Sequence, residues 1–202
     1  MIRASMLGDL MTYPEKDTLP DGAKTKLDKI ISQKLMNWRD IEFDFFTTEK
    51  GKRCENDSIE LYNEFTDEFY VKNVDRITMG NLTGECDILD REKDLVIDIK
   101  TSYSKATHPI VLRMSKLYEW QLRAYMYLYD VNNAELAYCL VNTPDDMIAK
   151  KDSLDWHIAD DVPQHLRVRT LRIERCQIKE DQMLKRIESS MNYVNEYLRN
   201  EK

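Results

Sequence analysis

A β-hairpin in the middle of the chain constrains the fold more than any other feature of the sequence. Residues 82–89 and 95–100 have the pattern of strands, and the five residues between them, 90–94, are all charged. Two such segments around a short polar turn are typical of a hairpin. A hairpin symmetric about the Glu92–Lys93 junction sets Asp87 opposite Asp98, with β-carbons about 5 Å apart. The sequence therefore predicts that two carboxylates meet across this hairpin.

The second strand of the hairpin separates a core face from a polar face. Side chains alternate along a strand, so the apolar residues 95, 97 and 99 are expected in the core, whereas Asp98 and Lys100 share the other face with Val96. Two unpaired carboxylates repel, and a cation between them resolves the repulsion. Oxygen ligands suit Mg²⁺ or Mn²⁺, and Lys100 can then orient a water or stabilise a phosphate. The alternative is an edge strand with solvated side chains.

The composition is that of a globular protein without a membrane segment. The chain has 202 residues, 42% of them hydrophobic, and is expected to form one domain over residues 1–202. No apolar run is long enough to cross a bilayer, and the N-terminus lacks the apolar core of a signal peptide, which predicts a cytoplasmic protein. The net charge of -7 argues against a protein that coats DNA by bulk electrostatics, but not against a DNA enzyme.

Arginines and cysteines form no clear motif. The densest basic stretch contains Arg167, Arg169, Arg172 and Arg175. It is interpreted as the solvated face of a strand, with a DNA-contacting track as the alternative. The cysteines are scattered, at Cys54, Cys86, Cys139 and Cys176. Without a C-x-x-C pair they are expected to be reduced and mostly buried, not ligands of zinc or an iron–sulfur cluster.

The remaining periodicities predict helices around a sheet. A short helix is expected to start near Met6, with Ser5 as its N-cap. Longer helices are predicted over residues 23–38, 48–69, 115–130 and 177–199. Further strands are predicted over residues 69–77, 136–141 and 166–173, with a polar loop over 143–163. This order predicts an α/β (α+β) fold with a mixed central β-sheet flanked by helices.

Three other segments of the chain suit a site that handles phosphate. Glu55 lies near the start of a helix, where the alternative is an acid favoured by the helix dipole. Gln121 and Tyr125 lie four apart on one helix face, where the alternative is packing with a surface amide. Arg3 and Ser5 open the first helix, whose N–H groups suit a phosphate; the alternative is an ordinary N-cap.

These residues together resemble a known family. Asp87 followed by Asp98-Ile99-Lys100 resembles the PD-(D/E)XK nuclease signature. Glu55 upstream and Gln121-x-x-x-Tyr125 downstream resemble the extra elements of its RecB-like branch. The segments Gly51-Lys52-x-x-Glu55-Asn56-Asp57 and Ala4-Ser5 are similar to those of the lambda-exonuclease and YqaJ-type phage recombination exonucleases. The resemblance covers nearly the whole chain in the same order.

The resemblance implies a restriction-endonuclease-like core and an activity. The activity is Mg²⁺-dependent hydrolysis of DNA phosphodiesters from the ends of linear duplex, 5′ to 3′, in phage-type recombination or repair. The implied metal ligands are Asp87, Asp98 and the Ile99 carbonyl, with support from Glu55. The implied partners are duplex DNA ends, a single-strand annealing protein and further copies of the chain in a trimer.

Other residues receive roles from the same resemblance. Lys100 would activate the water, and Gln121 would position Lys100 or the phosphate. The DNA contacts would be made by Arg3, Ser5 and Tyr125, with Ser5 at the terminal 5′-phosphate.

The chain departs from the family pattern at three places. Asp98 stands where many members have Glu, Cys86 replaces the Pro before the first acid, and the segment between Lys100 and the aromatic helix is short.

Three other functions compete with the exonuclease. An iron–sulfur relative would need a late cysteine cluster, but only Cys176 is present there. A non-catalytic DNA-binding module would have lost an acid or the lysine. A structure- or sequence-specific endonuclease would share the same metal site.

Overall fold

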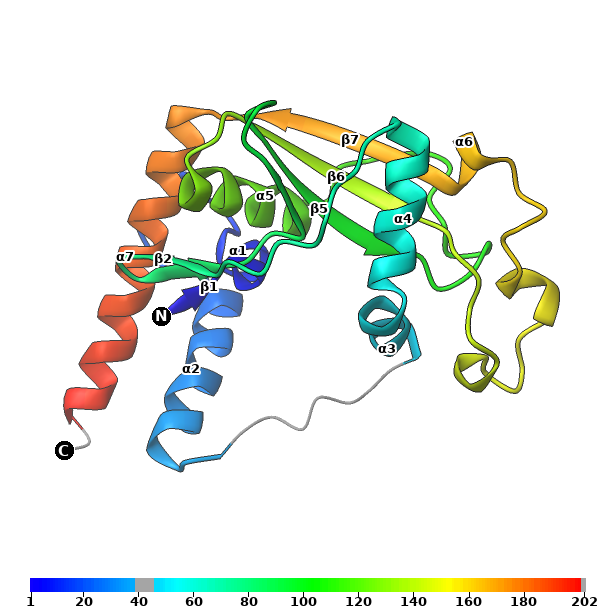
Figure 1. The fold of residues 1–202 in the computed structure, drawn as a ribbon. Coiled ribbons are helices and arrows are strands. Elements are labelled where there is room, and N and C mark those ends of the chain that lie inside the picture. Colours follow the sequence, from blue (N-terminus) through cyan, green and yellow to red (C-terminus); the bar gives the residue numbers. More distant parts are fainter. Residues whose placement is uncertain (39–45, 201–202) are drawn as a thin grey trace.

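The centre of the fold is a mixed four-stranded sheet. The computed structural model describes residues 1–38 and 46–200. The sheet has the order β4-β5-β6-β7 (Figure 1), formed by Ile88–Asp90, Leu95–Thr101, Asn133–Cys139 and Val168–Glu174. β5 and β6 are parallel, whereas β4 and β7 are antiparallel to their neighbours. The mixed sheet expected from the sequence is confirmed.

A second, smaller sheet ties the N-terminus to the hairpin region. Its order is β1-β3-β2, formed by Ile2–Arg3, Leu82–Gly84 and Ile77–Met79. β1 runs parallel to β3, with Ile2 beside Leu82 and Arg3 beside Thr83. The short helix η1 (Ala4–Met6) follows β1 directly. This pairing therefore places the first helical residues beside the chain that leads to Asp87.

Helices cover both faces of the larger sheet (Figure 1). On one face, α5 contacts β5, β6 and α7, and further helices pack around it. The helices of this group are α1 (Leu7–Leu10), α2 (Asp21–Leu35), α5 (Lys116–Tyr129) and α7 (Gln177–Asn200). The opposite face is covered by α4 (Glu55–Thr66), which follows α3 (Phe46–Arg53). The remaining short helices are η2 (Asp145–Met147), η3 (Leu154–His157) and α6 (Gln164–Arg167).

β5 is buried on both of its faces. Ile97 and Ile99 belong to the cluster under α4, whereas Val96 belongs to the cluster around α5. β5 lies between β4 and β6, and Asp98 is only 2% exposed. The predicted core face is confirmed, and the edge-strand alternative with a solvated Asp98 is wrong.

The helix predicted over residues 48–69 is wrong as a single element. It is divided into α3 and α4 at Cys54, whose backbone leaves helical geometry at φ -102° and ψ 17°. Lys50 and Cys54 are both buried at this break, and the Lys50 ammonium donates to three backbone carbonyls outside the two helices. Glu55 is consequently the first residue of α4 rather than an interior helical residue.

The strand predicted over residues 69–77 is also wrong for most of its length. Only Ile77 begins β2, and the residues before it form no ladder. Their apolar side chains point outward, with exposures of 97% for Phe69, 81% for Val71 and 77% for Val74. The segment is attached to the rest of the protein instead by a backbone hydrogen bond, in which the Asn73 backbone N–H donates to the Asp87 backbone carbonyl at 2.7 Å.

The predicted cap at Ser5 is wrong as well. Ser5 lies inside η1, whose N-cap is Arg3, and no side-chain capping bond is made there. α1 follows with Met6 in the cap position, again without a side-chain bond. The backbone pairing of β1 with β3 sets the start of this segment, so a capping hydroxyl is not needed.

The first strand of the predicted hairpin is interrupted. Residues 82–84 form β3 in the small sheet and residues 88–90 form β4 in the large sheet. Gly84 permits this crossing: a β-carbon there would lie 2.9 Å from Leu128 Cδ1 and 3.0 Å from Ala4 Cβ. Asp87 consequently sits where the chain passes from one sheet to the other.

Other sequence expectations are confirmed. α5 begins after Ser115, whose hydroxyl accepts from the Tyr118 amide, and α7 spans the predicted closing helix. The thiols of Cys54, Cys86 and Cys139 are free and buried, and that of Cys176 is free and half-buried. Among the helices of residues 1–38 and 46–200, none combines the length and apolar character needed to cross a membrane.

Candidate active site

The hairpin register brings the two predicted acids together. Ile88 pairs with Ile97 and Asp90 with Leu95, which sets Asp87 level with Asp98 one step beyond the last pair. Asp87 Oδ2 accepts a hydrogen bond from the Ile99 amide at 2.6 Å. The predicted proximity of Asp87 and Asp98 follows from this register, and Ile99 holds the Asp87 carboxylate in place.

Like charges and burial dominate the electrostatics of this pair. Burial and the neighbouring Asp98 carboxylate raise the pKa of Asp87 to about 7, more than Lys100 and the Ile99 amide lower it. Lys100 Nζ lies 2.6 Å from Asp98 Oδ2. Burial alone would lower the pKa of Lys100, but the Asp98 and Asp87 carboxylates outweigh it and raise that pKa. The two carboxylates therefore favour the ammonium form of Lys100.

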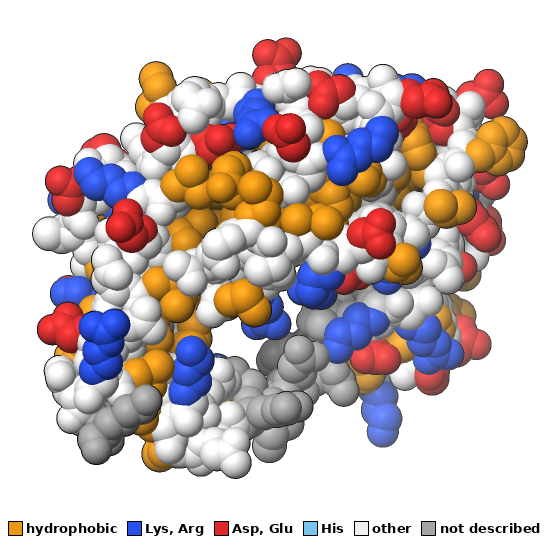
Figure 2. Space-filling view, turned by 60° about the vertical axis from the view of Figure 1, so that its left-hand side comes forward, with side chains coloured by type: hydrophobic (Ala, Val, Ile, Leu, Met, Phe, Trp, Pro, Cys, Tyr) orange, Lys and Arg blue, Asp and Glu red, His pale blue; other side chains and the backbone are white. Residues whose placement is uncertain are grey.

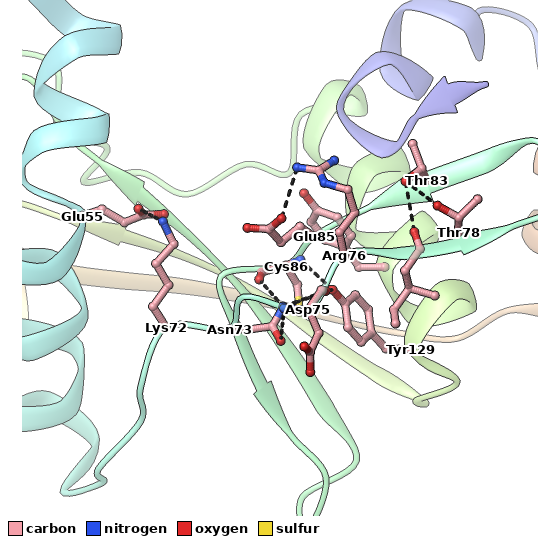
Figure 3. Close-up of polar contacts among 12 residues, drawn as sticks. Glu55, Lys72, Asn73, Asp75, Arg76, Thr78, Thr83, Glu85, Cys86 and Tyr129 are labelled. Atoms are coloured by element: carbon pink, nitrogen blue, oxygen red, sulfur yellow. Dashed lines mark hydrogen bonds and ion pairs between the residues drawn. The ribbon is translucent and has the colours of Figure 1, made fainter.

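Glu55 reaches the site from the opposite layer. As the first residue of α4 it points toward Lys72, and their side chains form an ion pair (Figure 3). Both residues line the same cavity as Asp87 and Asp98. Sequence reasoning missed Lys72, because it lies in the segment interpreted as a strand.

A hydrogen-bond network fixes the chain around Asp87 (Figure 3). The Asn73 side chain donates to the Cys86 carbonyl at 3.0 Å and to the Tyr129 hydroxyl at 3.0 Å. Tyr129 in turn donates to the Asp75 carbonyl. Together with the bond from the Asn73 amide to Asp87, these contacts fasten the irregular segment to the crossing between the sheets. Because Lys72 directly precedes Asn73, these hydrogen bonds also place Lys72 beside the acids.

α5 supplies the polar groups on the other side of the acids. Gln121 Nε2 lies 3.3 Å from Asp98 Oδ1 and 2.8 Å from the Tyr125 hydroxyl. Burial and the Asp98 carboxylate raise the pKa of Tyr125, so its hydroxyl stays neutral. The spacing of four residues places both side chains on one face of α5, as the sequence predicts.

These groups line one cavity, which we call the acid cavity. Its volume is about 510 Å³. It brings together the predicted residues Glu55, Asp87, Asp98, Ile99, Lys100, Gln121 and Tyr125. Although the net charge is -7, Figure 2 shows Lys and Arg side chains gathered around a hollow on one face of the molecule. A local basic environment thus exists on an acidic protein.

The acid cavity has the donor chemistry of a divalent-cation site. Asp98 Oδ2 is buried and lies 2.6 Å from the Lys100 ammonium, but it accepts no hydrogen bond of good geometry within residues 1–38 and 46–200. Two carboxylates and a backbone carbonyl are the oxygen ligands that Mg²⁺ and Mn²⁺ take. No set of three acid, His or Cys side chains in the described part of the chain is closed around a cation position. Lys72 and Lys100 instead neutralise Glu55 and Asp98.

The remaining predicted residues lie in a neighbouring pocket, which we call the terminal pocket. It has a volume of about 150 Å³ and is lined by Arg3, Ser5, Arg76, Glu85 and Tyr125, among others. Arg76 and Glu85 form an ion pair at 3.1 Å (Figure 3). Tyr125 lines both pockets, so the two adjoin. Arg76 was missed from the sequence for the same reason as Lys72.

The predicted basic stretch is engaged with the protein itself. Arg172 pairs with Glu135, and Arg175 pairs with Asp130 and Glu180. Arg167 and Arg169 donate to backbone carbonyls. These four arginines therefore have partners within the protein.

A mixed sheet whose hairpin pairs two acids, with a lysine two residues after the second acid, is typical of one class of nuclease. Comparisons with known proteins agree with this class. The model of the PD-(D/E)XK nuclease superfamily matches residues 17–190. The chain belongs to this superfamily, and the predicted family is confirmed.

Two solved structures are similar to the chain over nearly its full length. A phage related exonuclease from Haemophilus somnus 129PT has 25% identity and a TM-score of 0.90, covering 100% of this chain and 96% of that one. An alkaline exonuclease, LHK-Exo, from Laribacter hongkongensis has 17% identity and a TM-score of 0.73, covering 99% and 92%. The same enzyme in complex with dAMP has a TM-score of 0.71, with 17% identity and the same coverage of 99% and 92%. No curated protein matches the sequence closely enough to count as a relative.

Proposed function

We propose that this protein is a Mg²⁺-dependent DNA exonuclease that hydrolyses linear duplex from its ends, 5′ to 3′, in phage-type recombination or repair. The observation that carries the proposal is the pair of the half-buried Asp87 and the buried Asp98, with Lys100 beside it in one cavity. Membership of the nuclease superfamily supports hydrolysis of phosphodiesters. The similarity to a phage related exonuclease supports the choice of DNA ends.

In this proposal each residue of the acid cavity has one task. Asp87, Asp98 and the Ile99 carbonyl hold Mg²⁺, with Glu55 as a further acid; Mn²⁺ can substitute. When bound, the ion polarises the phosphate and neutralises developing charge. Lys100, held protonated by Asp98, donates to the attacking water or to the phosphate. Gln121 keeps the Asp98 carboxylate oriented.

The terminal pocket is what favours an exonuclease over an endonuclease. Arg3 and Arg76 line it and suit a phosphate dianion, and Ser5 adds a hydroxyl. A terminal 5′-phosphate bound there would lie next to the acid cavity, because Tyr125 lines both pockets. An endonuclease of the same superfamily is the second candidate, because the acid cavity alone would serve it equally well.

The partners follow from the same proposal. They are ends of double-stranded DNA and a single-strand annealing protein, with a homotrimer as the assembled form and the cytoplasm as the location, which is the host cytoplasm if a phage encodes the protein. Light scattering after size-exclusion chromatography measures the mass directly: three times 24.0 kDa supports the trimer, and 24.0 kDa contradicts it.

One assay tests the activity and its end-dependence together. End-labelled linear duplex and closed circular duplex are incubated with Mg²⁺ and, separately, with EDTA. The linear form should be degraded only with Mg²⁺, and the closed circle should survive. Equal cutting of closed circles would establish the endonuclease instead, and full activity in EDTA would refute the metal.

A second comparison tests the terminal pocket. Linear duplex with a 5′-phosphate should be degraded faster than duplex with a 5′-hydroxyl, and Ser5→Ala should remove most of this preference. Since Ser5 makes no capping bond, the variant should keep its unfolding temperature. Thr25→Ala, which also removes an exposed hydroxyl but lies on α2, is the matched control. An unchanged phosphate preference in Ser5→Ala would refute the assigned pocket.

A further inference from the structure

A third cavity adjoins the acid cavity on the side of Lys100. It has a volume of about 460 Å³ and is lined by the rings of Tyr103, Tyr118 and Tyr138, together with several hydroxyl side chains. We call it the tyrosine cavity. Thr48, Gly51 and Lys100 line both it and the acid cavity, so the two are continuous. Its volume is in the range of sites for small organic ligands.

α5 runs past all three cavities with one side-chain stripe. Tyr118 lines the tyrosine cavity, Gln121 the acid cavity, and Tyr125 both the acid cavity and the terminal pocket. Positions three and seven residues apart share a helix face. The terminal pocket and the tyrosine cavity therefore lie on opposite sides of the acids, in the order set by the helix.

The order of the three side chains in this stripe suits a short piece of DNA strand. Seven residues at a rise of about 1.5 Å separate Tyr118 and Tyr125 by about 10.5 Å along α5. Gln121 lies between them, about 6 Å from Tyr125 and about 4.5 Å from Tyr118 along the helix axis. A terminal phosphate beside Tyr125 and a scissile phosphate beside Gln121 leave the next nucleoside at Tyr118.

The sheet independently places an aromatic ring at the same point. In the parallel pairing of β5 with β6, Lys100 is directly beside Tyr138. The rings of Tyr118 and Tyr138 contact edge to face, with centroids 6.3 Å apart at an interplanar angle of 71°. Lys100 Nζ lies 5.1 Å from the centre of the Tyr118 ring. The lysine that faces the scissile phosphate is thus in contact with the aromatic pair.

We propose that the tyrosine cavity binds the nucleoside on the 3′ side of the scissile phosphate, with its base stacked on the Tyr118–Tyr138 pair. The inference rests on the proposed exonuclease function and adds a subsite to it. Aromatic stacking accepts every base, because each base has a π-face. The subsite therefore anchors the strand without sequence preference, as an enzyme that advances along DNA requires.

The test uses single abasic residues as probes of the contact. Linear duplexes with a 5′-phosphate carry an abasic residue at the first, second or third nucleotide, and the rate of the first cut is measured in single turnover. Removal of the second base should slow the wild-type protein roughly tenfold, within the range that one base–aromatic stack supports. In Tyr118→Leu and Tyr138→Leu this penalty should shrink to less than about twofold.

The informative quantity is, within each variant, the ratio of the rate on intact duplex to the rate on duplex with an abasic second nucleotide. Tyr118 also contacts Lys100, so a general loss of rate is expected in Tyr118→Leu, but it cancels in the ratio. Tyr118→Phe and Tyr138→Phe keep the ring and should keep the penalty. Tyr197→Leu on α7, an exposed tyrosine outside the three cavities, should behave as wild type.

Each result decides between two outcomes. Equal penalties in the Leu variants and in wild type, or a penalty lost equally in the Phe variants, would overturn the stacking site. If the Leu variants do not fold, wild type alone decides: a penalty confined to the first nucleotide, or absent at all three, overturns the placement. Failure of wild type to cut 5′-phosphorylated linear duplex with Mg²⁺ would instead refute the proposed function.

Discussion

Two groups of buried charge lie near β5, one at Lys50 and one in the acid cavity. The first is fully hydrogen-bonded within the protein, whereas the second is not. Lys50 is fully buried, and its ammonium donates to the carbonyls of Ser102 at 2.8 Å, Tyr103 at 3.1 Å and Val141 at 2.7 Å. An ammonium has three N–H donors, so all of them are used. Lys50 thereby joins α3 to the chain just beyond β5 and β6, and its burial lowers its pKa to about 8.

In the acid cavity, by contrast, the buried charges lack a complete set of partners. Asp87 and Asp98 bring like charges together, and their internal partners are Lys100, the Gln121 side-chain amide and the Ile99 backbone amide rather than a closed set of donors. The raised pKa of Asp87 reports the unmet cost of this arrangement. A buried charge satisfied by the chain itself serves the fold. A buried charge left unsatisfied beside a cavity is typical of a functional site.

The largest effect is expected from a change in the incomplete group. Asp98→Asn keeps the shape of the side chain and removes its charge, so DNA cleavage should fall below detection because the cation loses a ligand. Circular dichroism and thermal unfolding should show an intact fold. Asp155→Asn, at a highly exposed aspartate on η3, is the matched control and should keep full activity. Normal cleavage by Asp98→Asn would remove the distinction between the two groups.

The next effect concerns Lys100. Lys100→Ala should lower turnover by roughly 10²-fold or more, since the residue is proposed to act in the transition state, while DNA affinity changes little. Turnover is measured by rapid quench and affinity by fluorescence anisotropy of labelled duplex with Ca²⁺. Weaker binding with normal turnover would make Lys100 a phosphate anchor instead.

A change at Lys50, whose hydrogen bonds are complete, should lower the stability of the fold rather than the rate of catalysis. Lys50→Met leaves three buried carbonyls without a donor and should cost about 3 kcal/mol of unfolding free energy. Urea unfolding measures this loss, and the rate per folded molecule should stay within a few-fold of wild type. Lys24→Met on exposed α2 is the matched control and should change stability by no more than about 0.5 kcal/mol. A stable but inactive Lys50→Met would show that Lys50 belongs to the chemistry.

The smallest expected effect is a pH dependence of the cation-free protein. The folded pKa of Asp87, about 7, exceeds its ordinary value of 3.8, so the folded state binds the extra proton. The stability from this group is full below pH 3.8 and is lost as pH rises toward 7. In EDTA, Asp87→Asn should therefore gain about 1–2 kcal/mol relative to wild type between pH 5.5 and pH 8. A constant difference in urea unfolding across this range would contradict the raised pKa.

The sequence was sufficient where local periodicity and turn chemistry decide the structure. The hairpin register that aligns Asp87 with Asp98 follows from alternation and the charged turn, and α5 follows from helical spacing after Ser115. Both acids and Lys100 could therefore be assigned to one site before any contact was known, and the family resemblance added Gln121.

The sequence was insufficient where long-range contacts decide. Lys72 reaches Glu55 only because Asn73 fastens an irregular segment to Asp87, and an alternating pattern there predicted a strand instead. Tyr138 stands beside Lys100 through a parallel pairing of strands that a helix separates, and no local signal specifies that register. The break at Cys54 likewise depends on buried side chains on both helices.

The central claim is that a divalent cation completes the acid cavity, and calorimetric titration of the metal-free protein tests it directly. Mg²⁺ and Mn²⁺ are titrated at pH 8 into wild type and into Asp98→Asn, without DNA, and thermal unfolding is measured on the same samples. Wild type should bind saturably and unfold at a higher temperature with metal, whereas Asp98→Asn should do neither at the same concentrations. Equal binding by both proteins, or no binding by wild type, would contradict the account.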